Sequence, residues 1–524
     1  MTLRSKTAIC FANRHKTSTK KGGLCYRKVM VIIMSKQRLC VLLALSFSLS
    51  VFPSCQSAES TETTAADVTS TETTADTLER SGVPAGVDLG GETISIWYTT
   101  GGGLNYTDIA GEQTGDVMDD AVYNLNLAVQ ERLNCTIEFY DSGADQRYCD
   151  VEVSNLLLAD DTTYDLYYVT QWNSGNLVVQ GLYLNVADKD CFSFDKPWWD
   201  YDYMREMTIG EDKIYALVGD YALDRTRYLT CCYYNKQLYE DFYRDPDGLY
   251  QVVADGEWTF DRLAEISAEV YSDLNGDDKL DRDDRIGATL CWNDEIMSFM
   301  YSSDVRITER DKDDVPYLVM NNEHTMDVIQ ALYTLAKSSV GIYFGNESED
   351  IEVQKNTRKF TEGTSMFMFG QLATADLLRE MTDDYGIIPN PKFDAEQSDY
   401  HSTTYEAMRF MAVPYNCQKA DAACMLLEEL AFEGYNSILP VYYETVLKNK
   451  YVRDDVSAQM IDLIRENLTT DFAIIYGVGC GSLCYAHRDM IRNGKADFAS
   501  EYASKEAAAK AGLDELIEHF SAIE

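Results

Sequence analysis

Apolar positions recur with two different periods in the first half of the chain. From residue 93 the side chains alternate at the two-residue period of a strand, and from Met118 the apolar ones recur at helical spacing as far as Leu133. Strands that are separated by helices predict a parallel or mixed sheet with helices on both faces. The predicted strands are residues 93–98, 135–139, 164–169 and 214–218, and the predicted helices are residues 118–133 and a short helix that ends at Gly181.

A second series of elements begins near residue 258. Thr259 is the predicted N-cap of a helix that keeps Leu263, Ile266 and Val270 on one apolar face. The carboxyl end is expected to be largely helical. The predicted strands of this part are residues 366–369, 385–388 and 407–413, and the predicted helices are residues 420–432, 454–464 and 504–520.

An acidic loop at residues 273–284 follows the helix that Thr259 caps. Its oxygen-bearing side chains occupy loop positions 1, 3, 5, 9 and 12, which is the spacing of an EF-hand calcium loop. Asp278 stands where glycine normally makes the sharp turn, so we expect a modified or weaker site, with a structural role. The alternative is an acidic surface turn, because Asp, Asn and Gly favour turns. The predicted calcium ligands are Asp273, Asn275, Asp277, Asp281 and Asp284 through their side chains and Lys279 through its carbonyl.

Length and charge limit the classes of function. A chain of 524 residues is expected to form two or three domains. Its net charge of −42 argues against nucleic acid as a partner. The amino-terminal residues 1–54 contain Lys and Arg but no Asp or Glu, so the rest of the chain is more acidic still.

The amino terminus has the pattern of an export signal. The apolar residues 39–51 follow Lys36 and Arg38 and are too few to span a bilayer, which predicts a signal peptide within a leader at residues 1–54. Residues 1–33 are interpreted either as upstream sequence joined by a misplaced start or as a long n-region. Cys55 follows a small residue and resembles the lipidated cysteine of a bacterial lipobox. Phe52 stands where leucine is usual, so cleavage by the ordinary signal peptidase remains an alternative.

Residues 55–87 are predicted to be a disordered linker. This segment is rich in Ser, Thr and Glu and has few apolar side chains to bury. Ten cysteines follow Cys55, and their pairing cannot be deduced from the sequence. Cys480, Cys484 and His487 have the spacing of part of a zinc site, but no fourth ligand is evident, so buried thiols or a disulfide are the favoured interpretation.

The order of motifs along residues 88–524 resembles one known family, the family 1 extracellular solute-binding proteins, which are sugar-binding lipoproteins of bacterial ABC importers. Besides the lipobox-like leader and the acidic loop, the resemblance rests on short motifs: YYNKQL at 233–238, GEWT at 256–259, GIIPNPK at 386–392 and YYE at 442–444. It implies an α/β, two-lobed, periplasmic-binding-protein-like fold of type II, in which strands cross a hinge between the lobes.

The resemblance also implies an organisation and a function. Lobe one is expected at residues 88–222 and 410–438 and lobe two at 223–409 and 439–524, with hinge crossings at 215–234, 410–414 and near 438–442. The expected protein is a monomer, lipid-anchored on the outer face of the bacterial cytoplasmic membrane. It would capture a carbohydrate, in particular an oligosaccharide, between closing lobes and deliver it to ABC transporter permease subunits.

Sugars present C–H faces that stack on aromatic rings and hydroxyls that need donors and acceptors. Trp172 and Phe369 match positions where the resemblance places stacking aromatics, and Gln171 precedes Trp172 at the end of a predicted strand. Arg225, Arg227 and Arg409 are the basic residues nearest the expected cleft. The candidate ligand-binding residues are Trp172, Asn173, Trp292, Asn293, Asp294, Phe369, Gln371, Asp220, Tyr221, Tyr405 and Glu406.

Two other classes of function are alternatives for a chain of this composition. An exported glycoside hydrolase or lyase would use paired carboxylates, but no local motif of a nucleophile elbow, zinc protease or phosphate loop is present, so we expect no enzyme. A calcium-stabilised surface adhesin is the other alternative, against which the absence of repeats counts.

Overall fold

The computed structural model describes residues 80–101, 109–281, 283–345, 353–404, 407–448 and 455–523. Within these ranges, the side chains of residues 172–174, 294, 353–356, 446–448 and 455 are not described. The predicted leader, Cys55 and most of the predicted linker therefore lie outside the described residues. No described helix combines the length and apolarity needed to cross a bilayer.

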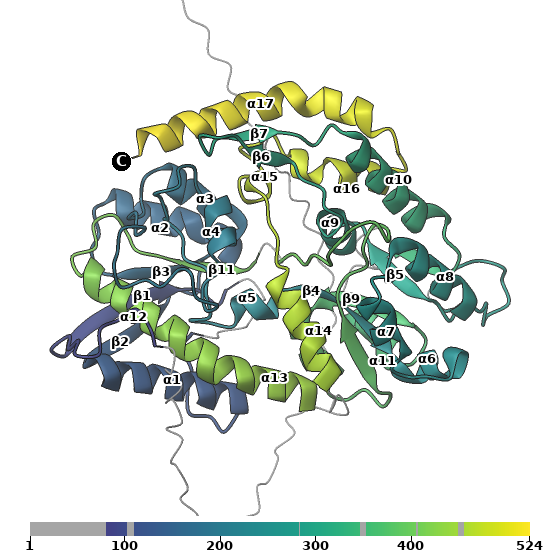
Figure 1. Cartoon of the computed structure of the whole chain (residues 1–524), viewed down its shortest axis with the longest axis horizontal. Coiled ribbons are helices and arrows are strands. Elements are labelled where there is room, and N and C mark those ends of the chain that lie inside the picture. The colour runs from purple at the N-terminus through teal and green to yellow at the C-terminus, as the bar shows by residue number, and fades with distance from the viewer. Residues whose placement is uncertain are drawn as a thin grey trace, which may run out of the picture. The chain divides into compact units, whose positions relative to one another are not determined.

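The first sheet has the strand order β11-β3-β1-β2 (Figure 1). β1 is parallel to β2 and β3, whereas β11 is antiparallel to β3. These strands correspond to the predicted ones at 93–98, 135–139, 164–169 and 407–413. Their bounds are β1 Glu92–Tyr98, β2 Cys135–Asp141, β3 Leu166–Thr170 and β11 Arg409–Ala412.

Helices cover this sheet as the apolar periodicity predicts. Helix α1 begins where the Asp116 side chain accepts hydrogen bonds from Met118 N and Asp119 N, and it buries Val122, Leu125 and Val129. It also contacts α12, which is the helix predicted at 420–432. The bounds are α1 Val117–Leu133, α2 Cys149–Leu158, α3 Gln171–Val179, α4 Tyr201–Glu206, α5 Asp224–Arg227 and α12 Ala420–Glu433.

The strand predicted at residues 214–218 is wrong. These residues are buried, but their described pairing is one antiparallel bridge, between Leu217 and Met411. Leu217 N donates to Met411 O at 2.8 Å, and Met411 N donates back at 3.0 Å. The apolar run therefore reflected burial and not a ladder of strand hydrogen bonds.

The second lobe is built on antiparallel strands in the order β10-β4-β9 and a parallel pair, β5-β8. Met366 N donates to Ile286 O at 3.1 Å and Phe367 N to Gly287 O at 2.7 Å, so the two groups of strands are hydrogen-bonded to one another. The bounds are β4 Thr230–Asn235, β5 Ala288–Cys291, β8 Ile342–Gly345, β9 Phe367–Gln371 and β10 Tyr385–Ile388. The strands predicted at 366–369 and 385–388 are confirmed.

The helices of this lobe include the one predicted to begin at Thr259. The Thr259 side chain accepts a hydrogen bond from Arg262 N, which confirms the predicted N-cap. A Cβ on Gly287 would lie 2.2 Å from Ser267 Cα, so the strand approaches α8 too closely for any other residue. The bounds are α6 Lys236–Tyr243, α7 Gly248–Ala254, α8 Phe260–Val270, α9 Asp294–Tyr301, α10 Glu323–Ser338 and α11 Val353–Thr361. A small hairpin of β6 Thr308–Arg310 and β7 Pro316–Leu318 lies between α9 and α10 in the sequence.

The carboxyl end is helical, as predicted. Helix α13 contacts α1 of the first lobe, and α14 contacts β10 of the second. Helix α17 runs along the top of Figure 1 and contacts α16, α10 and α3, so it reaches elements of both lobes. The bounds are α13 Leu439–Lys448, α14 Asp455–Glu466, α15 Phe472–Ile475, α16 Ala486–Arg492 and α17 Phe498–Ala522.

Three extended segments lie side by side between the lobes. Leu229 pairs with Thr404, and Ser402 pairs with Leu468. The first pairing falls within the crossing predicted at 215–234. Residues 410–414, where the second hinge crossing was predicted, include most of β11. Residues 438–442, near which the third crossing was predicted, lie in a helical stretch that begins with η3 Gly434–Ile438 and contacts α1. The predicted residue limits of the two lobes stay a prediction.

Candidate functional site

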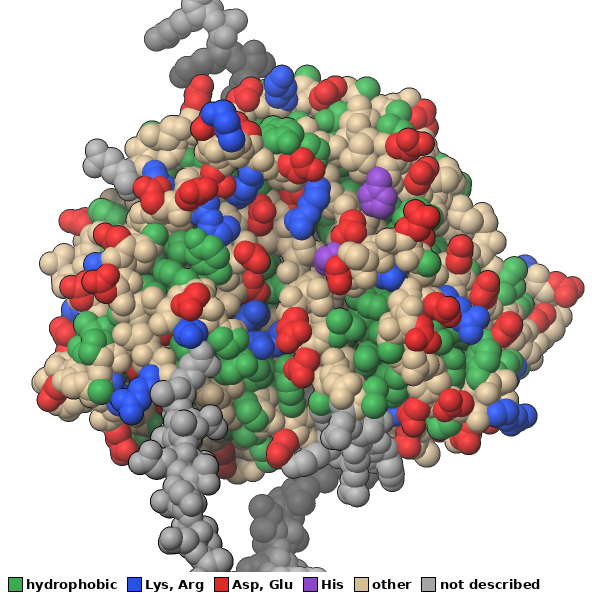
Figure 2. Space-filling view, viewed as in Figure 1, with side chains coloured by type: hydrophobic (Ala, Val, Ile, Leu, Met, Phe, Trp, Pro, Cys, Tyr) green, Lys and Arg blue, Asp and Glu red, His purple; other side chains and the backbone are tan. Residues whose placement is uncertain are grey.

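A cavity lies where the three hinge segments meet both lobes. It encloses about 640 Å³ of space free of protein atoms, open solvent included. The lining residues are Gln171 and Tyr203 from the first lobe, Asn293, Met297, Ser298, Tyr301 and Gln371 from the second, Thr230, Thr403, Thr404, Thr469 and Thr470 from the hinge, and Ile474 from α15. None of these described lining residues is charged, although acidic side chains are scattered over the face shown in Figure 2.

The hinge supplies a row of threonine hydroxyls. Thr230 N donates to Thr403 O at 2.9 Å, and Thr469 N donates to Ser402 O at 2.8 Å, so backbone pairing aligns the segments. The hydroxyls of Thr230 and Thr403 lie 3.3 Å apart, and Asn390 Nδ2 donates to Thr230 Oγ1 at 3.1 Å. Because the threonines belong to paired extended segments, their hydroxyls are held at fixed positions.

Tyr203 connects the first lobe to this row. Its hydroxyl is hydrogen-bonded to the Gln171 side chain and lies 3.1 Å from Thr404 Oγ1. Burial raises the pKa of Tyr203 to about 12, so the phenol keeps its proton at neutral pH. Gln171 is the first residue of α3, and its backbone N–H donates to Met408 O at 2.8 Å, which fixes the start of that helix beside β11.

The wall from the second lobe is oriented by α16. Arg488 Nη1 donates to Asn293 Oδ1 at 2.8 Å and its guanidinium lies 5.0 Å from the Trp292 ring centroid. Arg492 lies over the same ring at 4.2 Å. These contacts fix the orientation of Asn293 and place Trp292 against cations, an arrangement favoured by the quadrupole of the indole.

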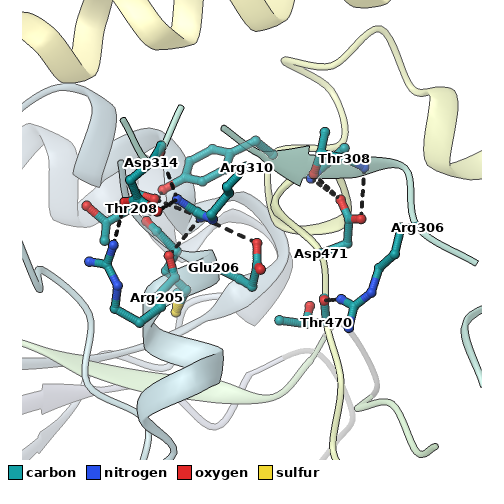
Figure 3. A network of polar contacts seen from close by, with 12 residues as sticks. Arg205, Glu206, Thr208, Arg306, Thr308, Arg310, Asp314, Thr470 and Asp471 are labelled. Atoms are coloured by element: carbon teal, nitrogen blue, oxygen red, sulfur yellow. Dashed lines mark hydrogen bonds and ion pairs between the residues drawn. The ribbon is translucent and has the colours of Figure 1, made fainter. Parts of the chain in front are cut away.

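A network of polar contacts borders the cavity beside Thr470 (Figure 3). Arg306 Nη1 donates to Thr470 O at 2.7 Å. Arg310 donates to Arg205 O at 2.8 Å and to Thr208 O at 2.9 Å, and Asp314 forms ion pairs with both arginines, Arg310 and Arg205. The β6–β7 hairpin is thus tied to α4 and the residues after it.

The predicted ligand-binding residues do not all reach this cavity. Asn293 and Gln371 line the cavity. Trp292 is the residue directly before Asn293 in the sequence. Phe369 is buried edge-on against Phe299, with ring centroids 4.7 Å apart, and does not line the cavity. The role of Asn293, Gln371 and Trp292 in binding stays a prediction.

Asp220 and Tyr221 are held by other contacts. Asp220 is ion-paired with Arg465, and Arg225 Nη1 lies 3.5 Å from it. The Tyr221 hydroxyl donates to Leu217 O at 2.6 Å and accepts from Met411 N at 2.9 Å. Neither residue lines the cavity, and their predicted role in ligand binding stays a prediction.

The remaining candidates lie outside what the structure describes. Trp172 and Asn173 are in the first turn of α3, directly after Gln171, but their side chains are not described. The same holds for the side chain of Asp294, and Tyr405 and Glu406 lie outside the described residues. Their predicted roles stay predictions.

Sequence reasoning missed the hinge threonines, Tyr203, Met297, Ser298 and Tyr301. The paired threonines at 403–404 and 469–470 are a visible signal, because two adjacent β-branched hydroxyl residues favour an extended segment. That signal alone does not show that the two pairs lie at one hinge.

The basic residues expected near the cleft are engaged in ion pairs. Arg225 lies 3.0 Å from Asp200, Arg227 lies 3.2 Å from Asp376, and Arg409 lies 3.2 Å from Asp224. All three arginine side chains are buried. None of the three lines the described cavity.

The acidic loop at 273–284 uses its carboxylates as hydrogen-bond acceptors within the loop. Asp273 accepts from Gly276 N at 2.6 Å and from Asp278 N at 2.9 Å. The buried Asp284 accepts from Leu274 N and Asp281 N, both at 3.1 Å. Asp278 has a φ of 60°, the left-handed conformation that glycine adopts in such a turn.

No described group of three or more His, Cys, Asp or Glu side chains is arranged to hold a metal ion. The calcium site of the acidic loop stays a prediction. Among the residues of the partial zinc pattern, Cys480 and Cys484 are buried, and burial lowers the pKa of His487 to about 3. This agrees with the favoured interpretation of buried thiols.

The fold is that of a type II periplasmic binding protein, with two α/β lobes joined by extended segments and a helical carboxyl end. UspC of M. tuberculosis has a TM-score of 0.52 at 12% sequence identity, covering 80% of this chain and 100% of that one. An ABC substrate-binding protein from Listeria monocytogenes, solved in complex with cycloalternan, has a TM-score of 0.50 at 10% identity, covering 82% and 99%.

A maltose/maltodextrin-binding domain from Bdellovibrio bacteriovorus bound to maltotriose has a TM-score of 0.49 at 13% identity, covering 81% of this chain and 100% of that one. No family model and no curated protein sequence matches the chain. UspC and the Listeria protein establish the fold. The resemblance to solute-binding proteins, which the sequence motifs predicted, is thereby confirmed at the level of the fold.

Proposed function

We propose that this chain is the substrate-binding protein of an ABC transporter and captures an uncharged carbohydrate, in particular an oligosaccharide, between its two lobes. The observation that carries the proposal is the cavity at the hinge, whose described lining offers hydroxyls and amides from both lobes and no charged side chain. The Listeria monocytogenes protein of this fold, which was solved in complex with cycloalternan, supports the ligand class.

The chemistry of the lining suits sugar hydroxyls. Each hydroxyl of a sugar donates one hydrogen bond and accepts others, and the threonine hydroxyls and the amides of Gln171, Asn293 and Gln371 offer both functions. A ligand favours the closed form only through contacts that it makes better there. Because Gln171 belongs to one lobe and Asn293 and Gln371 to the other, closure brings them to the same ligand.

The remaining parts of the proposal concern location and partners. Cys55 would carry the lipid anchor, and the linker at 55–87 would let the domain move near the membrane. The closed form would dock on permease subunits of the transporter. The fold and the export signal predicted at residues 39–51 support this arrangement.

Binding is tested by calorimetry and thermal shift with neutral mono- and oligosaccharides and, in parallel, with uronic-acid oligosaccharides. Wild-type protein should bind a neutral sugar and gain thermal stability as its concentration exceeds the dissociation constant. Asn293→Ala and Gln371→Ala should each weaken that binding by roughly 5- to 150-fold, because each removes hydrogen bonds worth about 1–3 kcal/mol.

Gln330→Ala is the matched control, since this amide on α10 bonds only within its own helix among the contacts described, to Thr334, and does not line the cavity. It should bind as the wild type does. Unchanged affinity in both cavity variants would move the site elsewhere, and binding of only the uronic-acid sugars would contradict an uncharged ligand.

A further inference from the structure

Two cysteine side chains meet at the side of α12. Cys191 lies in the loop before Trp198 and Cys424 lies on α12, and each thiol is close enough to shift the pKa of the other. Cys191 is partly exposed, whereas Cys424 is buried. Neither lines the cavity, so carbohydrate binding makes no use of them.

Contacts on both sides of the cysteines hold the loop in register with the helix. Asp421 accepts from Lys189 Nζ at 2.8 Å, and Glu428 accepts from Ser193 N at 3.2 Å. Positions 421, 424 and 428 of a helix share one face, because they are three and four residues apart. The loop therefore follows that face of α12, with Cys191 opposite Cys424.

Glu428 strengthens this attachment. Its carboxylate also accepts from Trp198 Nε1 at 3.2 Å and from Trp199 Nε1 at 2.7 Å, and its exposed fraction is 0%. A carboxylate buried with this many donors fixes its surroundings, since moving it would leave a charge unsatisfied. The backbone around the two thiols is thus held in place before any covalent bond forms.

The amino-terminal end of the domain lies over the same place. Gly82 N donates to Glu428 Oε1 at 2.8 Å, and a Cβ on Gly82 would lie 2.2 Å from Cys191 O. The segment where the predicted linker enters the domain therefore packs directly on the loop of Cys191. A covalent bond between loop and helix would secure this entry point.

We propose that Cys191 and Cys424 form a disulfide in the exported protein. The oxidant is a disulfide, either of a small thiol or of an oxidoreductase. The Cys191 thiolate attacks one sulfur of that disulfide and releases the first thiol. The Cys424 thiolate then attacks Cys191 Sγ and releases the second. Two protein thiols are oxidised, one oxidant disulfide is reduced, and the two protons end on the released thiols.

The order of attack follows from the local chemistry. The neighbouring Cys424 side chain lowers the pKa of the Cys191 thiol, and Cys191 is also the more exposed of the two, so Cys191 is the nucleophile. The pKa of Cys424 is raised, first by the neighbouring Cys191 side chain and then by burial. Once Cys191 is in the mixed disulfide, it no longer carries the charge that opposes ionisation of Cys424.

The bond is tested on the purified mature chain. After incubation with glutathione disulfide, free thiols are alkylated in guanidinium chloride without reduction, and tryptic peptides are examined by mass spectrometry. We expect a peptide that joins Cys191 to Cys424, and its loss after dithiothreitol. Complete alkylation of both cysteines after this treatment would overturn the proposal.

A thermal measurement supplies a second test that needs no peptide mapping. Reduction of the oxidised wild type should lower its melting temperature by roughly 2–5 °C, because a cross-link between distant positions restricts the unfolded chain. Cys191→Ser should lack this response, whereas Cys417→Ser, whose thiol is bonded to Asp165 at 3.9 Å, should keep it. An equal response to reductant in Cys191→Ser and the wild type would contradict the assignment.

Discussion

Asp471 shows how one side chain joins two distant parts of the chain. Its carboxylate caps α15 by accepting from Ala473 N at 2.8 Å. It also accepts from Ile307 N at 2.9 Å and from the Thr308 backbone and hydroxyl at 3.0 and 2.7 Å, as Figure 3 shows for Thr308. At 2% exposure, the carboxylate has little water to replace these donors. Asp471 thus holds the segment around Thr470, which lines the cavity, against the start of β6.

Asp471→Ala should lower the free energy of unfolding by about 2–4 kcal/mol, because the buried N–H groups of Ile307 and Thr308 lose their acceptor. Urea denaturation followed by circular dichroism measures the change. Asp497→Ala is the control, since Asp497 caps α17 at the surface, where loss of a cap costs about 1 kcal/mol. Equal losses in the two variants would show that burial of Asp471 adds nothing.

At the scale of an element, the acidic loop illustrates a pattern with two physical interpretations. Its carboxylates satisfy backbone N–H groups, as in ordinary turns, yet they also crowd like charges into one short segment. Buried Asp284 ties the loop to its own beginning through Leu274 N. A bound cation would offset the repulsion among these carboxylates, which is why calcium remains a proposal for this loop.

We expect calcium to raise the melting temperature and chelation to lower it, with little change in sugar affinity, because the loop residues do not line the cavity. Differential scanning calorimetry with millimolar calcium or EDTA measures the effect. Asp273→Asn with Asp277→Asn should abolish it. If the wild type responds no differently from this double variant, the loop is an acidic turn that does not bind calcium.

The whole molecule is organised around its hinge. Three paired segments connect the lobes, and the β6–β7 hairpin adds a polar attachment through Arg310, Arg205 and Asp314. Glu206 lies 3.4 Å from Arg310, and burial is the main cause that raises the pKa of its carboxyl. Such a contact resists separation of the hairpin from α4.

Arg310→Ala should therefore favour more open forms of the unliganded protein and weaken sugar binding several-fold, because the binding-competent closed form becomes less populated. Small-angle scattering should show a larger radius of gyration without ligand and recovery of the compact value at saturating ligand. Tyr317→Ala, at an exposed position of the same hairpin, is the control. An unchanged radius and affinity in Arg310→Ala would exclude a role in closure.

The sequence determined the local elements of this protein. Strands β1, β2 and β3, helix α1 and the Thr259 cap follow from periodicity and from a side chain acting on its own neighbours, so a short window of sequence contains the cause. The fold class also followed, from the order of those elements and of short motifs. Asn293 and Gln371, which line the cavity, were found because each stands at the end of a strand.

Tertiary structure alone decided the rest. Residues 214–218 look like a strand, but burial and strand pairing give the same apolar run. The row of hinge threonines depends on pairing between residues 229–230, 402–404 and 467–469, and nothing local to any one segment shows which others it meets. The contact between Cys191 and Cys424 is of the same kind, because it depends on packing between residues far apart in the chain.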